Sequence, residues 1–230
     1  MVTEELIPSI DKRISTWLEL QRKKRAESKS PPVITVSREF GCEGYALAEE
    51  LKKILDEKTE HPWTIFDNAL IKMILEDRDY SKHLLESLGE RAQFMDDLID
   101  MISPSWDSEE EAFQSIVESV FSIAHKGYAI IVGRGAFFIT RNLPNCHHIR
   151  LAAPLEFRAQ AISDRLNISQ EEAVEIVKRK EEERALFLKR FLNCELSADQ
   201  FHAVFNSGKA PIKHIAKTFA NFIGELDQTG

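Results

Sequence analysis

A glycine-bearing segment follows the first β-branched run of the chain. The run Val33–Ser37 reads VITVS, the segment after it reads REFGCEGY, and an apolar helical pattern begins at Ala46. Gly41 and Gly44 let the backbone curl closely, and the N-terminus of the following helix offers unbonded N–H groups and a positive dipole end. This arrangement suits a phosphate group. A plain tight turn between a strand and a helix fits the same pattern, and both interpretations stay open here.

Arg38 places a permanent positive charge inside this segment. A guanidinium presents a planar fork of donors that matches phosphate oxygens. In phosphoryl transfer, a well-placed arginine contributes roughly 10³–10⁵ in rate. We therefore expect Arg38 to reach a bound phosphate. The alternative is a structural ion pair with Glu39 or another carboxylate.

Two more charged residues follow predicted strands directly. Asp67 comes after the run Trp63–Phe66, and Arg134 follows Tyr128–Val132 with a glycine on each side. Ligands of parallel sheets bind at the carboxyl ends of the strands. We expect Arg134 to contact a ligand. Asp67 either contacts a phosphoryl acceptor or a magnesium-bound water, or caps the next helix.

The elements that must position these residues alternate between strand and helix along the chain. Strands are predicted over residues 33–37, 63–66, 128–132, 148–152 and 202–205, and helices over 46–55, 69–75, 81–102, 108–126, from Pro154 onward, over 170–191 and over 209–226. Ser108 with Glu111, and Ser169 with Glu172, form capping boxes at two helix starts. This alternation predicts an α/β fold in which helices cover both faces of a parallel sheet.

The composition excludes several classes of protein. The chain has 230 residues and a net charge of −8, with an acidic pI of about 5.5. An acidic chain is a poor binder of nucleic acid, whose phosphates need clustered lysine and arginine. Three isolated cysteines predict neither a disulfide framework nor a metal site. Since no apolar run has membrane-spanning length and no signal sequence is recognised, we expect no membrane association and a cytoplasmic protein.

We expect residues 1–30 to form a separate N-terminal helical extension and residues 31–230 to form one domain. Leu6, Ile10, Ile14 and Leu18 recur at helical spacing within a helix predicted over residues 4–28. Pro31 and Pro32 then end the pattern. The apolar stripe either packs on the domain or joins two copies of the chain in a homodimer.

Several segments resemble one known family. Residues 33–51, VITVSREFGCEGYALAEEL, resemble the first motif of the cytidylate-kinase-like family of P-loop proteins, which runs close to ITISREFGSGGREIAKKLA. The resemblance continues in the family's order through Phe66–Leu70, Ile131–Ala136, His148–Arg158 and His202–Ser207. It covers about residues 33 to 225. Because the matches keep their order, the set is far more specific than any one motif.

The resemblance implies a three-layer α/β/α P-loop NTPase-like fold with a mainly parallel five-stranded sheet and a helical lid. It implies a kinase that transfers a phosphoryl group from ATP to a nucleoside monophosphate or a related phosphorylated small molecule, with Mg²⁺ as a possible cofactor. Arg134 would contact the acceptor, and Asn206 would lie near the adenine of the donor. Arg158 and Arg184, on the lid side, would join Arg38 in neutralising the transferred group. The donor phosphates would be bound by Ser37, Gly41, Cys42, Glu43, Gly44, Tyr45 and Ala46.

The chain also departs from the pattern of nucleoside monophosphate kinases. Gly44 stands where their loop has the lysine that reaches the β- and γ-phosphates, and Tyr45 stands where they have the hydroxyl that ligates magnesium. Gly135 and His202 replace two expected carboxylates. The alternative function is therefore a protein that binds a nucleotide or phosphorylated metabolite with little or no catalysis.

Overall fold

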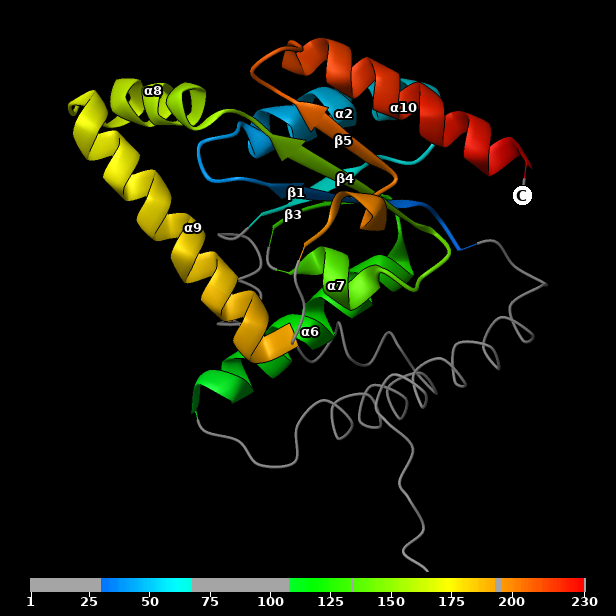
Figure 1. Ribbon diagram of the computed structural model, residues 1–230. Coiled ribbons are helices and arrows are strands. Elements are labelled where there is room, and N and C mark those ends of the chain that lie inside the picture. Colours follow the sequence, from blue (N-terminus) through cyan, green and yellow to red (C-terminus); the bar gives the residue numbers. More distant parts are fainter. Residues whose placement is uncertain (1–29, 68–107, 134, 193–195, 230) are drawn as a thin grey trace, which may run out of the picture.

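The computed structural model describes residues 30–67, 108–133, 135–192 and 196–229, which form one α/β unit (Figure 1). The predicted N-terminal extension, the helices predicted over 69–75 and 81–102, and Arg134 lie outside the described residues.

The centre of the unit is a five-stranded sheet whose strands all run parallel. The strands are β1 (Val33–Arg38), β2 (Thr64–Phe66), β3 (Ala129–Val132), β4 (Cys146–Ala152) and β5 (Ala203–Asn206), and their order across the sheet is β2-β3-β1-β4-β5. The prediction of a parallel five-stranded sheet is confirmed. With β1 at the centre, the loop that follows it lies between the ends of β3 and β4.

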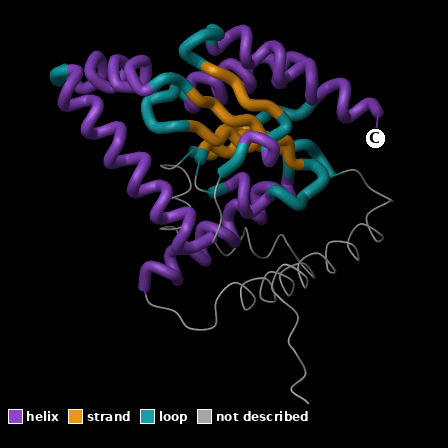
Figure 2. Tube along the Cα trace, in the orientation of Figure 1, coloured by secondary structure: helices purple, strands orange, loops and turns teal. Residues whose placement is uncertain are grey.

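Helices cover both faces of the sheet, which confirms the three-layer prediction (Figure 2). The helices are α2 (Gly44–Lys58), α6 (Ser108–Lys126), α7 (Ala136–Thr140), α8 (Leu155–Leu166), α9 (Gln170–Leu192) and α10 (Ile212–Thr229). Helices α2 and α10 pack on one face, and α6 and α7 on the other. Helices α8 and α9 form a hairpin beside the sheet, joined by a small apolar cluster of their own (Figure 1).

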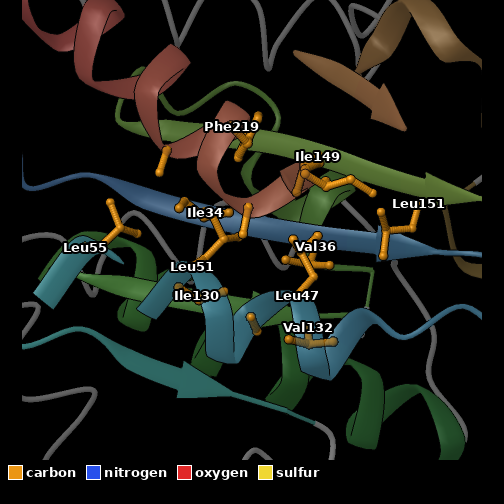
Figure 3. Close-up of a cluster of buried hydrophobic side chains, with 14 of the residues drawn as sticks. Ile34, Val36, Leu47, Leu51, Leu55, Ile130, Val132, Ile149, Leu151 and Phe219 are labelled. Atoms are coloured by element: carbon orange, nitrogen blue, oxygen red, sulfur yellow. The ribbon is translucent and has the colours of Figure 1, made fainter. Parts of the chain in front are cut away.

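The face beneath α2 and α10 is built from aliphatic side chains that alternate along the strands (Figure 3). Ile34 and Val36 of β1 lie among equivalent residues of β3 and β4 and against Leu51 of α2 and Phe219 of α10. Each of these side chains is at most 1% exposed. Because residues two apart on a strand share a face, the β-branched run VITV supplies this layer directly.

The opposite face contains polar side chains among the apolar ones. Thr35 of β1 and His148 of β4 are both buried, and Thr35 Oγ1 lies 2.7 Å from His148 Nδ1. The ring of Phe137 lies 5.1 Å from that of His148 and 4.5 Å from that of Phe201, measured between ring centroids. Phe137 belongs to α7 and Phe201 follows a short 3₁₀ turn at Ala198–Gln200; neither element was predicted, because both are too short for a periodic pattern.

Some element ends differ from the prediction. Helix α2 begins at Gly44 instead of Ala46, because the backbone carbonyl of Glu43 already accepts the N–H of Leu47. Strand β4 begins at Cys146, two residues before the predicted start. The Ser169–Glu172 capping box is confirmed, with reciprocal hydrogen bonds of 3.0 and 3.2 Å.

Two further boundaries shift for local reasons. Pro154 is the N-cap residue of α8, so the helix itself begins at Leu155. Strand β5 extends to Asn206, and α10 starts at Ile212 instead of Lys209, because the carbonyl of Asn206 accepts the N–H groups of Lys209 and Ala210 in a turn.

Candidate functional site

The loop after β1 lies against the start of α8 and therefore needs glycine at position 41. Gly41 has a φ of 95°, and a Cβ there would lie 2.8 Å from both Cβ and O of Arg158. Any side chain would be strained by the backbone angle and would also collide with α8. This explains one of the two glycines that marked the loop in the sequence.

Arg38 lies across two other glycines. A Cβ at Gly44 would be 2.6 Å from Cδ of Arg38, and a Cβ at Gly133 would overlap Nη1 of the same side chain. The stem of Arg38 therefore passes over the first residue of α2, and its guanidinium reaches the carboxyl end of β3. Glycine at position 44, where the resemblance expects the loop lysine, is what leaves room for this arginine.

Glu39 joins the loop to strand β4 and to helix α8. Its Oε2 accepts the N–H of Ala153 at 3.1 Å and lies 3.4 Å from Nε of Arg158, while its Oε1 lies 3.7 Å from Nη2 of Arg150. The sequence left an Arg38–Glu39 ion pair open; the ion pairs found for Glu39 are with Arg150 and Arg158.

Arg158 is 12% exposed and is bonded mainly to backbone. Its Nε donates to the carbonyl of Ala153 at 2.9 Å, and its Nη1 donates to the carbonyl of Phe40 at 3.2 Å. These bonds tie the turn before α8 to the loop.

Helix α9 reaches the same loop with two side chains one turn apart. Arg184 donates from Nη1 to the carbonyl of Arg38, and Glu181 accepts the N–H of Phe40. We refer to Arg38, Glu39, Arg158, Glu181 and Arg184 as the arginine–glutamate cluster. The structure thus brings together the three predicted catalytic arginines. Their contacts with the loop join residues far apart in the sequence, 118 positions for Arg158 with Phe40 and 146 positions for Arg184 with Arg38.

The predicted phosphate-binding residues lie along this loop and the first turn of α2. Ser37 lies on β1, Gly41 to Glu43 form the turn, and α2 begins with Gly44, Tyr45 and Ala46. Tyr45 is 49% exposed.

Cys42 is buried in the loop. Burial raises the pKa of its thiol above the usual value, against an opposing hydrogen bond from Ser207. The thiol therefore stays protonated at neutral pH, which disfavours a nucleophilic or redox role.

Asp67 and Asn206 lie at the ends of the two edge strands. Asp67 directly follows β2. Asn206 ends β5, and its Oδ1 accepts the N–H of Gly208 at 3.0 Å, which stabilises the turn before α10. The two residues therefore lie on opposite sides of the central loop.

Sequence reasoning missed Glu39 as a structural partner of two arginines, and it missed Glu181 and Arg150 altogether. Glu39 had a visible signal, because a carboxylate next to Arg38 in a loop needs its own partners. The spacing of Glu181 and Arg184, three apart on a helix, indicates a shared face. Nothing in the pattern showed that this face meets the loop.

The described residues contain neither a metal-ligating cluster nor a membrane-spanning helix. Within them, no group of three or more histidine, cysteine, aspartate or glutamate side chains is arranged to hold a metal ion. None of the described helices has an apolar stretch long enough to cross a bilayer.

Comparison with known proteins identifies relatives of this fold. In solved structures, the chain is similar to an uncharacterized protein from Eubacterium ventriosum, at 15% identity and a TM-score of 0.60, over 86% of this chain and 99% of that one. It is also similar to shikimate kinase from Bacteroides thetaiotaomicron (14% identity, TM-score 0.41, 86% and 98% covered) and to TT1252 from Thermus thermophilus (18% identity, TM-score 0.41, 86% and 99% covered). No curated protein matches the chain. Residues 33–209, from β1 to the turn after β5, match the family that the sequence motifs resemble, and the chain belongs to the cytidylate kinase-like family.

Proposed function

We propose that the protein transfers a phosphoryl group from ATP to a nucleoside monophosphate, cytidylate first among them, with Arg38 in the role of the missing loop lysine. The observation that carries this proposal is the path of Arg38 over Gly44 to Gly133. Its stem crosses the start of α2, where the helix dipole favours an anion, and its guanidinium lies beside Gly133 at the end of β3. A lysine at position 44 and an arginine at position 38 would compete for this space.

The chemistry asks the protein mainly to position two phosphates and to stabilise charge. The N–H groups of Gly41, Glu43, Tyr45 and Ala46 would bind the donor phosphates together with Ser37, whereas those of Cys42 and Gly44 already donate to carbonyls within the turn. Arg38 would stabilise the charge of the transferred group, joined by Arg158 and Arg184. Helix α9, which already contacts the loop, would exclude water when the substrates are bound.

The acceptor and the adenine would bind on either side of this loop. Asp67 follows β2 at one edge of the sheet, and Arg134 follows β3 in sequence, so these two residues would contact the acceptor. Asn206 ends β5 at the other edge and would lie near the adenine of the donor.

Mg²⁺, when bound, would offset the negative charge of the donor phosphates. In such sites it is typically held by one or two carboxylates, phosphate oxygens and water. Asp67 is the carboxylate whose place at a strand end fits this role. The phenol of Tyr45 fits poorly, because Mg²⁺ ligands in this position are small hydroxyl groups.

A second function, binding without phosphoryl transfer, is favoured by the bonding of Arg158. Two of its nitrogens already donate to backbone carbonyls, and Glu39 lies beside it. An arginine held in this way supports the loop and has fewer donors left for a moving phosphoryl group.

The test is ADP production from ATP and Mg²⁺ with a panel of nucleoside monophosphates. Arg38→Ala is expected to lower kcat by roughly 10³ or more. Arg165→Ala, at an exposed position of α8, is the matched control and should keep the wild-type rate. No turnover with any acceptor at high enzyme concentration would contradict the kinase.

Thermal shift with ATP, CTP, CMP and dCMP separates the two functions. Stabilisation without turnover would favour the binding protein. If no ligand raises the melting temperature, both proposals are wrong.

A further inference from the structure

One carboxylate oxygen of α9 is surrounded by three donors. Oε1 of Glu181 accepts the N–H of Phe40 and lies 3.6 Å from Nη1 of Arg158 and 3.5 Å from Nη1 of Arg184. The donors come from the loop after β1, from α8 and from α9 itself. The fold therefore assembles a small anion site here and fills it with one of its own side chains.

The donors are those that a phosphoryl oxygen uses. A backbone N–H in a loop before a helix and two guanidinium groups bind phosphate at many sites. Glu181 brings a single negative charge to this place, whereas the phosphates of a nucleotide bring more. Two anions cannot share these donors without strong repulsion, because the charges would lie within about 4–6 Å of each other.

The side chain of Glu181 can leave. It is 31% exposed, whereas Arg158 beside it is 12% exposed. Glu181 belongs to one face of an exposed helix, so a rotamer change would move its carboxylate into solvent at modest cost. Arg184, one turn further on, would keep its place next to the loop.

We propose that Glu181 is a built-in competitor for this anion site: it holds the site in the unliganded protein and is displaced by a phosphoryl group of the bound ligand. This inference rests on the proposed function, since it concerns the same loop. It makes binding selective for the charge of the ligand, because a ligand must carry enough negative charge to displace the carboxylate. Weakly charged ligands, such as nucleosides, would leave Glu181 in place and α9 in its unliganded contact.

The alternative role for Glu181 is a tether that merely fixes α9 to the loop. Glu181→Gln separates the two roles, because glutamine keeps an oxygen that accepts the N–H of Phe40 and loses the charge. If Glu181 competes for the site, Glu181→Gln should let anions bind more tightly. If Glu181 only fixes α9 to the loop, Glu181→Gln loses the ion pairs and should leave anion binding unchanged or weaken it.

The experiment is calorimetric titration of the full chain with pyrophosphate, for wild type, Glu181→Gln and Glu182→Gln. Glu182 is exposed and one residue away, so its variant makes the same change in net charge elsewhere on the helix. Glu181→Gln should bind pyrophosphate about fivefold more tightly than wild type, which corresponds to about 1 kcal/mol for a partly exposed charge. The gain should shrink as salt rises. Glu182→Gln should match wild type.

Equal or weaker binding by Glu181→Gln would overturn the inference, as would an equal gain in Glu182→Gln or no measurable pyrophosphate binding by any of the three proteins. A melting curve of each variant confirms that it is folded. Turnover of ATP is measured in parallel, so that the two proposals fail separately. A gain in pyrophosphate affinity without turnover of ATP would contradict only the proposed kinase activity. Turnover without that gain would contradict only the proposed role of Glu181.

Discussion

Two regions of the molecule are held together by different forces. The layer between the sheet and helices α2 and α10 is apolar, and its side chains are almost fully buried. The arginine–glutamate cluster, at the carboxyl ends of β1 and β4, is made of charged groups that keep 12–31% exposure where they pair. The first region stabilises by removing apolar surface from water. The second region adds little net stability, because its ion pairs are partly exposed. Substitutions in the first region should therefore lower the stability of the protein, and substitutions in the second should mainly lower its activity.

The largest effect is expected in this apolar layer. Phe219→Ala removes a ring that is 1% exposed and leaves a cavity, so the free energy of unfolding should fall by about 3–5 kcal/mol. Urea denaturation measures this loss. The catalytic rate per folded molecule, or ligand affinity if the protein only binds, should stay close to wild type.

Phe222 supplies the control on the same helix. It is 37% exposed and stacks on Phe219 with ring centroids 6.0 Å apart, so Phe222→Ala should cost about 1 kcal/mol or less. A Phe219 variant that keeps its stability, or that loses activity while folded, would break the contrast between the two regions.

This contrast also explains what could be predicted from the sequence. The strands and the parallel sheet follow from β-branched runs such as VITV and AIIV and from the alternation of strands and helices along the chain. The glycine-bearing loop was visible because glycine and the strand–helix order are local signals. Contacts such as Phe40 with Glu181 join residues 141 positions apart, and no local pattern records such a pairing.

An intermediate effect is expected where Arg38 crosses Gly44. Gly44→Ala places a Cβ 2.6 Å from Cδ of Arg38, so the arginine must move; we expect a loss of about 1 kcal/mol in the free energy of unfolding and lower activity. In an Arg38→Ala background, the same change should be neutral or stabilise by up to ~1 kcal/mol, since alanine suits a helix better than glycine.

A double-mutant cycle by urea denaturation measures this coupling, expected at about 1–2 kcal/mol. Additive effects would mean that the side chain of Arg38 does not lie against position 44. The second region would then lack the feature on which the proposed function rests.

A pH-dependent effect is expected from the polar groups on the other face of the sheet. Burial, with smaller contributions from His202 and His147, lowers the pKa of His148 from 6.5 to about 3. The folded protein therefore holds His148 neutral where the unfolded chain binds a proton. Stability from this group is present above pH 6.5 and is lost as the pH falls from 6.5 toward 3, by at most about 1.4 kcal/mol per pH unit.

His148→Gln should reduce this slope by close to one proton between pH 6 and 4, as measured by urea denaturation at each pH. His202, whose pKa burial also lowers, gives the variant a remaining slope. An unchanged slope in His148→Gln would show that this face of the sheet excludes water less than its burial indicates.

The central place of β1 has a consequence for how the chain folds. Val33 pairs with Ala129 on one side and with Cys146 on the other, so β1 is synthesised before both of the strands with which it pairs. Sheets built from such distant pairings fold slowly, because the entropy of closing the loops is lost before the contacts form. During synthesis the run VITV is an unpaired apolar edge of the kind that aggregates or recruits chaperones. We expect refolding on a time scale of milliseconds to seconds, with the loop's contacts to α9 among the last to form.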